Sequence, residues 1–460
     1  MHRLSSLALI VASAGSAWAQ TAPQPLMGLP LQGLSPTQLT QFEEGHTTFI
    51  TPLTIADGVG PIFNEVSCNT CHNQPAAGGF SPRRVTRFGV AAVGSTPFDP
   101  LNFLGGTLLQ DQSLDLNCRE YVPTEATVTA MRGTPILFGA GLLERISDAD
   151  VQTVLASQSP SVQGVMRTVV PIENPGSTPL GSRFGWKGGV ATVHSFSLDA
   201  SLNEMGITSF FLPNENAPNG DGALLAACDT VNDPEDLPDG TGLTRADRFT
   251  HFQRFLAPPA QTPRSGMLGE AIFASVGCAE CHTPRYTLPS DPDPVFSGRV
   301  VAPYSDFLLH DMGALGDGIV DGIASETQMM TRPLWGMAFR TALLHDGRAT
   351  GAAFDGLVDM VVAEHGGQAS ASRAAYQALT AGDRALVVAF LQSLGRAEFD
   401  WDLDNELTEF DWYFLEPFLT GPAPAATMGP DHPGAVCDVN QDGAFDLVEF
   451  GQLQRVWTGQ

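Results

Sequence analysis

The chain contains two copies of one short pattern, and this repeat restricts its fold more than any other feature. Residues 62–72 read IFNEVSCNTCH, and residues 272–282 read IFASVGCAECH. Each copy places two thiols a short loop apart and a histidine directly after the second thiol. Two thiols at this spacing can form thioether bonds to the vinyl groups of one haem, and the adjacent imidazole can then bind the iron. The sequence therefore predicts two covalently bound haem c groups, held by Cys68, Cys71 and His72 and by Cys278, Cys281 and His282.

Zinc binding and dithiol chemistry are the other common uses of a C-x-x-C pair. A zinc ribbon would place its paired units about 15 to 20 residues apart, far closer than here. A thioredoxin-like redox pair would have a strand before it and a helix after it. In both copies the apolar spacing of I-F-x-x-V instead predicts a short helix before the thiols. The histidines and the two copies favour haem.

The first residues have the features of an export signal. A basic start is followed by an apolar stretch from Leu7 to Ala12 and by a small-residue cleavage pattern that ends at Ala19. This stretch is too short to span a membrane, and no later segment forms an apolar run of that length. We expect residues 1–19 to be a signal peptide and the mature chain to be exported, periplasmic or secreted, without a membrane span. A retained N-terminal anchor is the alternative.

Length and charge limit the number of domains and the partners. The 460 residues are enough for two or three domains. Lys and Arg total 23 against 50 Asp and Glu, which gives a formal net charge of −27, and Lys187 is the one lysine. Nucleic acid and anionic membrane surfaces are therefore poor candidates as partners, and we expect no nucleic acid to be bound.

The repeat extends beyond the thiols and divides the chain into units. Each copy is followed by an Arg near a Pro, Arg132 in MRGTP and Arg332 in TRPLW, which could pair with haem propionates or only cap a loop. Each unit ends in an apolar helix pattern, at 245–259 and 383–395. The 48 Gly and 34 Pro predict long loops. We expect a mainly α fold with two cytochrome c-like haem domains, at 40–258 and 264–397.

Five further segments resemble a known family. FGWKGG and NEMGITS (184–209), YSDFLLHDMG (304–313), RPLWGMAFRTALLHDGRA (332–349) and EHGGQA (364–369) are similar to the di-haem oxidoreductases, also called thiol oxidoreductases. That family is itself similar to bacterial di-haem cytochrome c peroxidases and to the di-haem enzyme that matures methylamine dehydrogenase. The resemblance covers residues from about 40 to 397. It implies a peroxidase-like oxidoreductase that takes electrons from a small redox protein.

The resemblance also implies ligands on the far side of each haem. A haem with two protein ligands carries electrons, whereas an open position can bind peroxide. For the C-terminal haem the resemblance implies His365, with Met312 as second choice. No histidine lies between His72 and Arg132, where the peroxidases have one. The N-terminal haem therefore has an open, reactive position or one of these ligands: His46, His194, Met131 or Tyr121.

The peroxidase relatives place a Trp between the haems and an acid over the reactive iron. Trp186 and Glu204 occur here in the corresponding order. An acid at that position could relay the proton that cleavage of the O–O bond requires. A packed aromatic and a surface acid are the alternative interpretations.

The last sixty residues contain a second repeat. Residues 438–449, DVNQDGAFDLVE, match a calcium loop position by position: Asp438, Asn440, Asp442, Gly443, Ala444, Asp446 and Glu449. Residues 400–411 match less well, with Asp400, Asp402, Asp404 and Asp411 in register and Asn405 at the glycine position, so we expect this site to be weaker. The segment 398–460 resembles dockerin-type EF-hand repeats, which implies a cohesin-like partner; a calcium-stiffened cap without a partner is the alternative. Cys118, Cys228 and Cys437 form an odd set, which allows one disulfide and one lone thiol.

The sequence thus predicts an exported di-haem c-type oxidoreductase with a calcium-binding tail. One haem would take electrons from a small redox protein, and the other would react with peroxide or an organic substrate. A non-catalytic di-haem electron carrier is the principal alternative. A calcium-dependent scaffold component whose haems are incidental is the third.

Overall fold

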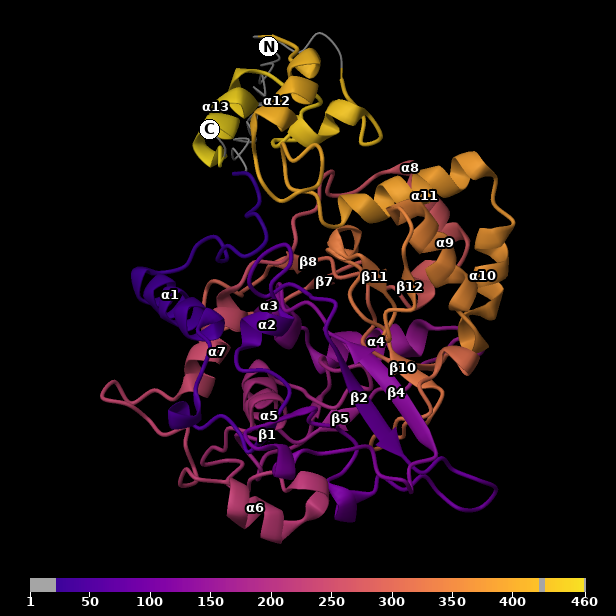
Figure 1. The fold of residues 1–460 in the computed structure, drawn as a ribbon. Coiled ribbons are helices and arrows are strands. Elements are labelled where there is room, and N and C mark those ends of the chain that lie inside the picture. Colours follow the sequence, from indigo (N-terminus) through magenta and orange to yellow (C-terminus); the bar gives the residue numbers. More distant parts are fainter. Residues whose placement is uncertain (1–21, 422–426, 459–460) are drawn as a thin grey trace, which may run out of the picture.

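The computed structural model describes residues 22–421 and 427–458, so the expected signal peptide at 1–19 lies outside the described residues. Helices hold 36% of the residues and strands 12%, which confirms the mainly helical fold class. The strands of the described residues form separate two-stranded pairs, and long loops connect the elements (Figure 1). No helix within 22–421 or 427–458 combines the length and apolar character needed to cross a membrane.

The elements follow one another as short helices and strand pairs. The helices are α1 (Pro36–Ile50), α2 (Cys68–Cys71), α3 (Ala140–Glu144), α4 (Asp148–Ser157), α5 (Val193–Met205), α6 (Gly222–Cys228), α7 (Arg245–Phe255), α8 (Leu268–Ser275), α9 (Phe354–Glu364), α10 (Ser370–Gln377), α11 (Ala381–Ser393), α12 (Glu409–Leu415) and α13 (Leu447–Val456). The strands are β1 (Ile62–Phe63), β2 (Arg84–Gly89), β3 (Gln112–Ser113), β4 (Val128–Gly133), β5 (Thr168–Val169), β6 (Leu180–Gly181), β7 (Tyr286–Thr287), β8 (Val300–Val301), β9 (Leu309–Asp311), β10 (Gln328–Met330), β11 (Ala342–Leu343) and β12 (Ala349–Thr350).

Two helix pairs of similar construction stand beside the two C-x-x-C-H motifs. Helix α1 packs on α7, and α8 packs on α11. A Cβ atom on Gly45 of α1 would lie 2.4 Å from the carbonyl oxygen of Arg248, and one on Gly269 of α8 would lie 2.0 Å from that of Leu386. Glycine therefore lets the backbones touch at each crossing. Both closing helices expected from the sequence, α7 and α11, are confirmed.

The expectation of a short helix before each motif is right for one copy and wrong for the other. Ile272 and Phe273 belong to α8. Ile62 and Phe63 instead form strand β1, which pairs antiparallel with β3. Gly58, Gly60 and Pro61 precede them, and Gly60 has a φ of +113°, which is outside the helical region. Residues that break a helix therefore override the apolar spacing of the first copy.

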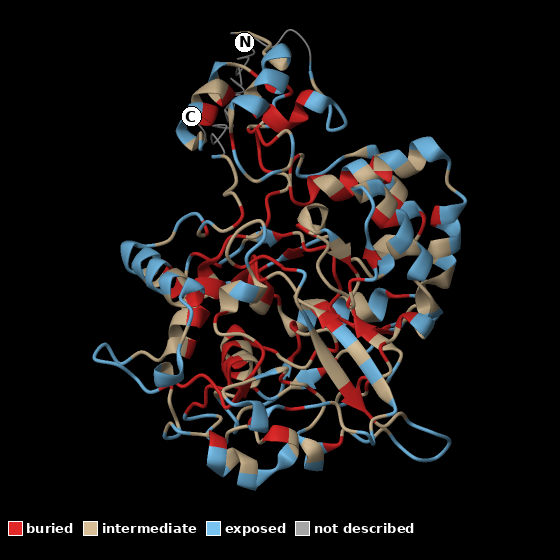
Figure 2. Cartoon of the chain, viewed as in Figure 1, coloured by how far each residue is buried: buried red, intermediate tan, exposed pale blue. Residues whose placement is uncertain are grey.

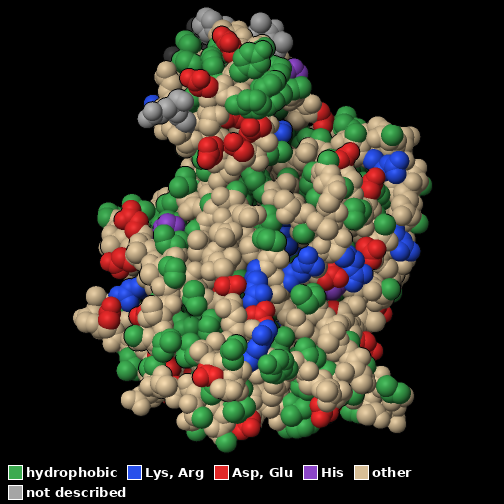
Figure 3. Space-filling model, viewed as in Figure 1, with side chains coloured by type: hydrophobic (Ala, Val, Ile, Leu, Met, Phe, Trp, Pro, Cys, Tyr) green, Lys and Arg blue, Asp and Glu red, His purple; other side chains and the backbone are tan. Residues whose placement is uncertain are grey.

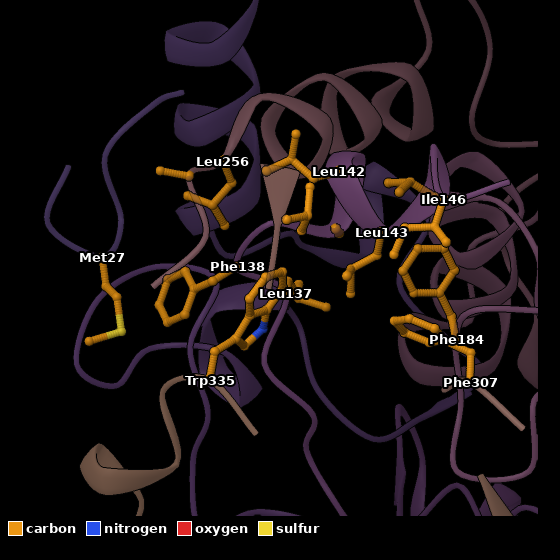
Figure 4. Packing of buried hydrophobic residues seen from close by; sticks show 14 of the residues in the cluster. Met27, Leu137, Phe138, Leu142, Leu143, Ile146, Phe184, Leu256, Phe307 and Trp335 are labelled. Carbon is orange, nitrogen blue, oxygen red and sulfur yellow. The ribbon is translucent and has the colours of Figure 1, made fainter. Parts of the chain in front are cut away.

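One hydrophobic cluster draws residues from both expected haem units. It includes Phe138 and Leu256 of the first unit and Trp335 of the second (Figure 4). A Cβ atom on Gly139 would lie 3.0 Å from the Trp335 ring, so the indole packs directly on the backbone there. Figure 2 shows buried residues through the middle of the molecule and exposed outer faces on α1, α6 and α10. The two units therefore share one core.

The C-terminal tail has a small core of its own at one end of the molecule (Figure 1). Residues near the N-terminus attach it to the body. The backbone N–H of Gln24 donates to Glu398 Oε2 at 2.8 Å, and that of Met27 donates to Asn405 Oδ1 at 2.8 Å. The core of the tail consists of Phe399, Leu407, Leu415, Val436, Cys437, Val439, Phe445 and Leu453.

The three cysteines outside the motifs divide into one bond and one thiol. Cys118 and Cys228 form a disulfide between the turn after β3 and helix α6. Cys437 is buried in the core of the tail and is not bonded to another cysteine. The expected division into one disulfide and one lone thiol is therefore confirmed, and the structure supplies the pairing.

A buried cluster of charges joins the two units. Arg132 Nε donates to Asp317 Oδ2 at 2.8 Å and Lys187 Nζ lies 2.9 Å from Asp317 Oδ1, and the side chains of Asp317 and Lys187 have no exposed surface. Burial raises the pKa of Asp317, but Arg132 and Lys187 outweigh this effect and hold it below its usual range. One carboxylate from the second unit thus pairs with two cations from the first.

We predict that Asp317→Asn destabilises the protein by about 3–5 kcal/mol, because two buried cations lose their counter-charge. Urea unfolding followed by circular dichroism measures this loss. Glu364→Gln is the matched control, because its ion pair with Arg348 has side chains that are 42% and 40% exposed; it should cost less than about 1 kcal/mol. Equal losses for the two variants would contradict the prediction.

Candidate functional site

The first motif lies on the wall of a cavity of about 470 Å³, here called the first cavity. Cys68 and Cys71 belong to the one-turn helix α2, which Ser67 caps by accepting from the Thr70 N–H. His72 follows the helix, and its Nδ1 bonds to the carbonyl oxygen of Gly79 at 3.0 Å. Nδ1 is therefore the protonated nitrogen, and Nε2 keeps its lone pair for a metal. Burial lowers the pKa of His72 to about 4, which keeps the ring neutral.

The second motif has the same arrangement around a cavity of about 230 Å³, the second cavity. Cys278 and Cys281 lie on a 3₁₀ turn, and His282 bonds through Nδ1 to the carbonyl oxygen of Tyr304 at 3.0 Å. Burial, with a smaller effect of His365, lowers the pKa of His282 to about 4. Both histidines are thus neutral and oriented by a carbonyl, as a metal-binding imidazole requires.

The thiols lack the character of zinc ligands or of a redox dithiol. Burial raises the pKa of Cys68, Cys71 and Cys278 to about 12. Zinc binding and thiol exchange both use the thiolate, which this environment disfavours. None of the four motif thiols forms a disulfide. The chemistry of the donors therefore fits thioether attachment of haem better than the alternatives.

Three arginines that form no close ion pair with a carboxylate line the two cavities. Nε of Arg87 in the first cavity and Nε of Arg340 in the second are shielded from solvent and lack a hydrogen-bond partner. Arg332 in the second cavity donates only to the carbonyls of Arg183 and Gly185, at 3.3 and 3.4 Å, and burial followed by Arg340 lowers its pKa to about 10. Carboxylates such as haem propionates would supply the missing counter-charge. Both cavities therefore fit the expected cofactor.

The four arginines differ in how the sequence reveals them. Arg132 and Arg332 lie at the cavities as expected, but Arg132 already has an acidic partner in Asp317. Arg87 was missed because its position depends on the β2–β4 register. Val85 pairs with Arg132, and alternation places Arg87 on the same face. Arg340 was missed because nothing in the local sequence separates it from a surface residue.

Trp186 lies at both cavities. Its Nε1 donates to the carbonyl oxygen of Gly133 at 2.9 Å, its ring meets that of His345 at 6.2 Å, and the guanidinium of Arg332 lies 5.9 Å from its centroid. The structure thus brings the expected aromatic to the boundary between the two cavities, held by contacts on several sides.

Glu204 belongs to a polar wall of the first cavity. It lies one residue before the end of α5, the helix that also carries Asp199 at its middle, and Arg87 from β2 interacts with both carboxyls. Burial raises the pKa of Glu204 to about 7, although Arg87 and a hydrogen bond from Asn64 Nδ2 at 2.7 Å act in the opposite direction. A group with this pKa can hold and release a proton near neutral pH. The structure places Glu204 beside the thiol of Cys71, whose pKa it helps to raise.

The named ligand candidates for the N-terminal haem do not line the first cavity. Met131 is exposed and lies on the opposite face of β4 from Arg132. Tyr121 is exposed, His46 packs on Phe42 and Phe252 outside the cavity, and His194 lies 3.7 Å from Asp247. Among the described residues that line this cavity, His72 is the only histidine and Met205 the only methionine.

Both candidates for the C-terminal haem line the second cavity. His365 bonds through Nδ1 to the carbonyl oxygen of Val361 at 2.7 Å, which leaves Nε2 for a metal. Its influence on the pKa of His282 shows that the two rings lie near each other. Met312 comes from an adjoining loop, where a Cβ atom on Gly366 would lie 2.8 Å from the Met312 oxygen. The two segments thus pack backbone to backbone.

His310 is a buried neighbour of the second motif for which the sequence suggested no role. Its Nε2 lies 2.8 Å from Asp306 Oδ2, and its Nδ1 lies 3.8 Å from Cys281 Sγ. Gln158 also donates to Asp306 Oδ2, at 2.7 Å. Burial lowers the pKa of His310, but the bond to Asp306 and the neighbouring Cys281 outweigh it and raise the pKa to about 10. This cluster braces the second attachment segment.

The two segments of the tail that the sequence predicts as calcium loops have a turn in the left-handed conformation. Gly443 has a φ of +85° and Asn405 a φ of +68°, the left-handed conformation that a calcium loop needs at its turn. Glu449 is fully buried, and its Oε1 has no hydrogen-bond partner. In the first loop, carboxylate oxygens of Asp400, Asp402 and Asp411 lie within 4.8 Å of one another. The second loop contains the other expected ligand residues in order: Asp438, Asn440, Asp442, Ala444 and Asp446. In the first loop, Asp404 Oδ1 accepts from the Glu406 N–H.

Two cavities with matching thiol pairs, neutral histidines and unpaired arginines define a protein built around two redox cofactors. Residues 111–394 match the family described as "Di-haem oxidoreductase, putative peroxidase". This match covers more than half of the chain, which therefore belongs to the di-haem oxidoreductase family. Membership implies two haem cofactors and an oxidoreductase activity of peroxidase type.

Solved structures give distant similarities. A MauG-like protein associated with microbial copper homeostasis is 15% identical, with a TM-score of 0.36 over 82% of this chain and 93% of that chain. A variant of the diheme peroxidase BthA from Burkholderia thailandensis is 14% identical, with a TM-score of 0.37 over 81% and 94%. Hydrazine synthase from Kuenenia stuttgartiensis is 14% identical, with a TM-score of 0.32 over 85% and 99%. A comparison with curated proteins gave no match.

The free energy of unfolding of the wild type should fall as the pH rises, and we predict that Glu204→Gln abolishes this fall. The pKa of Glu204 is about 7 in the folded chain, above the ordinary glutamate value of 4.5, so the folded state holds the proton to a higher pH. The free energy of unfolding therefore falls between about pH 4.5 and 7, by at most about 3 kcal/mol, and the loss is complete above pH 7. Urea unfolding over this pH range measures the difference. Glu43→Gln, on the exposed side of α1, should follow the wild type; the same curve for Glu204→Gln would contradict the prediction.

Proposed function

We propose that the protein is an exported di-haem c-type peroxidase, in which the first cavity holds the reactive haem and the second holds an electron-transfer haem. One observation carries this assignment. The first cavity contains an acid of suitable pKa and, among its described lining residues, no second histidine, whereas the second cavity has His365 near His282. Bound haem supplies an iron that changes oxidation state by one electron at each centre.

The proposed reaction is the reduction of hydrogen peroxide by two electrons and two protons to two molecules of water. The electrons come one at a time from a small reduced redox protein, which is oxidised. Glu204 holds a proton beside the reactive position and delivers it when the O–O bond breaks. Arg87 supplies positive charge next to Glu204 and Asp199, and Trp186 occupies the boundary across which electrons pass. Oxidation of an organic substrate at the same cavity is the variant of this proposal.

The redox partner would meet a face with mixed charge. On the face shown in Figure 3, Lys and Arg side chains gather across the middle of the molecule, while acidic side chains are spread over it and over the tail. Charge of this kind would guide a small redox protein toward one orientation. We propose a periplasmic or secreted location, which the sequence of residues 1–19 supports.

Spectroscopy of the purified holoprotein tests the peroxidase proposal. We predict one high-spin and one low-spin ferric haem by electron paramagnetic resonance, with the high-spin signal lost when peroxide is added. A reduced small cytochrome should then be oxidised in proportion to peroxide. Two low-spin haems that peroxide leaves unchanged, in both the oxidised and the half-reduced protein, would overturn the proposal in favour of a di-haem electron carrier.

We predict that His365→Ala converts the low-spin haem to a high-spin form, because the second cavity loses the imidazole proposed as the second iron ligand. Absorption and electron paramagnetic resonance spectra measure this change. Met312→Leu is the matched control, since it alters the other candidate in the same cavity with little change in volume. A low-spin signal that survives in His365→Ala and disappears in Met312→Leu would assign the ligand to Met312 instead.

For the tail we propose two calcium sites, at 400–411 and 438–449, that stiffen a C-terminal cap; docking to a cohesin-like partner is the second proposal for it. Buried carboxylates that form no ion pair among the described residues, Asp400 and Glu449, support the sites. Burial and then Asp411 raise the pKa of Asp400 to about 7, and burial raises that of Glu449 to about 7. Stability contributed by these groups in the absence of a cation is lost as the pH rises through about 7, because the folded state must then hold adjacent buried negative charges. Calcium would offset that cost.

We predict that calcium raises the unfolding temperature of the tail in the full chain and that Glu449→Gln weakens calcium binding at least about tenfold, since the loop loses its bidentate carboxylate. Calorimetry with calcium and with a chelator measures both effects. Glu416→Gln, an exposed acid of the tail outside both loops, is the control and should bind calcium like the wild type. A tail whose unfolding ignores calcium would contradict the proposal.

A further inference from the structure

We infer that Asn64, which lies between strand β1 and the first C-x-x-C-H motif, is a positioning residue that keeps the proton of Glu204 on the oxygen facing the first cavity. This inference rests on the proposed function of Glu204 as proton donor. Asn64 is only 1% exposed. The sequence patterns that identify the motif and Glu204 say nothing of a contact between them.

The orientation of the Asn64 amide is fixed by its neighbours. Asn64 Oδ1 accepts from the backbone N–H of Asp111 at 3.1 Å. A backbone N–H can only donate, so the atom that faces it must be the amide oxygen. The amide nitrogen therefore faces the other way, where Nδ2 donates to Glu204 Oε2 at 2.7 Å. An amide flip would set two donors against each other on one side and two acceptors on the other when Glu204 is ionised.

This orientation assigns the two oxygens of Glu204 to different tasks. Oε2 accepts from Asn64 in either protonation state, so a protonated Glu204 carries its hydrogen on Oε1. Among the described residues, no hydrogen bond reaches Oε1, while Glu204 lines the first cavity. The acidic hydrogen is thus presented to whatever occupies the cavity. Without a donor at Oε2, the proton could sit on either oxygen, and part of the population would point it at the protein.

The backbone of Asn64 fixes the distance between the acid and the motif. The N–H groups of Asn64 and Glu65 both donate to the carbonyl oxygen of Glu204, at 2.8 and 3.0 Å. The carbonyl oxygen of Asn64 accepts from Arg83 Nη2 at 3.0 Å and from Gln112 Nε2 at 2.5 Å. Asn64 is therefore bonded through its side chain, its N–H and its carbonyl. One short segment positions both Glu204 and, a few residues on, the thiols of the first motif.

The charges that face Glu204 come from several elements and oppose one another. Arg87 of β2 and Arg83 before β2 favour the ionised carboxylate, and Asp199 of α5 disfavours it. The thiol of Cys71 on α2 also lies close, and it no longer titrates once it forms a thioether. Burial outweighs the rest. The hydrogen bond from Asn64 stabilises the carboxylate, so its loss should raise the pKa of Glu204 further.

Asn64→Asp and Asn64→Ala test the inference in the full chain. Asn64→Asp keeps the shape and the acceptor for the Asp111 N–H but replaces the donor to Glu204 with an acceptor. Asn64→Ala removes both. The readout is the midpoint of the Glu204 step in the pH dependence of the free energy of unfolding, together with the pH dependence of the high-spin haem spectrum. We expect the midpoint to rise by about one pH unit or more in both variants.

Two comparisons separate positioning from a general structural effect. In a Glu204→Gln background the step that belongs to Glu204 is absent, so neither substitution at Asn64 should produce a shifted midpoint. The one expected change there is the titration of the new carboxyl group in Asn64→Asp. Gln112→Ala removes a bond to the Asn64 carbonyl but none to Glu204, so it should leave the midpoint in place. An unchanged midpoint in Asn64→Ala, or an equal shift in Gln112→Ala, would overturn the inference. If Asn64→Ala does not fold, the comparison of Asn64→Asp with the double variant Asn64→Asp, Glu204→Gln tests the inference instead.

The test does not depend on turnover of peroxide. A raised midpoint in a protein that does not react with peroxide would support the role of Asn64 and reject the peroxidase. Normal peroxide reduction with an unmoved midpoint would reject the role of Asn64 and leave the peroxidase standing. In the active holoprotein, we expect the alkaline limb of the pH–rate profile, where the proton donor is lost, to move with the same midpoint.

Discussion

The hydrogen bond from each motif histidine to a backbone carbonyl is the contact on which both sites depend. His72 makes it to Gly79 and His282 to Tyr304, each at 3.0 Å. The bond selects the tautomer that leaves Nε2 as a ligand atom and fixes the plane of the ring. The local structures around it differ, with strand β1 before one motif and helix α8 before the other. The same electronic arrangement has therefore been reached on two different local backbones.

The cavities around these histidines differ in charge, and this difference supports a division of labour. The first contains Arg87, Asp199 and Glu204, whose mutual interactions keep one proton available near neutral pH. The second is lined by many apolar side chains, including several methionines, and contains His310, His345 and His365 besides the motif histidine. Trp186 reaches both. The buried carboxylate of Asp317 also joins the two units. Because its ion pairs with Arg132 and Lys187 are shielded from water, they help to fix the relative placement of the two cavities.

Local spacing was enough to predict the thiols, the motif histidines and the helices α7 and α11, because each depends on residues a few positions apart. Features that depend on pairing between distant segments could not be predicted. The helix expected at Ile62 does not form, because Gly60 and Pro61 directly before it disfavour a helix. Met131 was a ligand candidate from its place in the chain, but it lies on the face of β4 opposite Arg132. Arg87 faces the first cavity only because of its register with β4. The bond between Asn64 and Glu204 joins residues 140 positions apart, and no periodicity could reveal it.

The attachment of the tail bears on its two proposed roles. Asn405 stands at the turn position of the first proposed calcium loop, and its side chain bonds to both the N–H and the carbonyl of Met27, at 2.8 and 3.1 Å. The loop geometry and the attachment to the body therefore share one residue. The outer face of α12 remains exposed, with Phe410 and Tyr413 at 54% and 73%. Because the body holds the loop and leaves this aromatic face uncovered, a cap that stiffens with calcium and a surface that binds a partner can coexist in one tail.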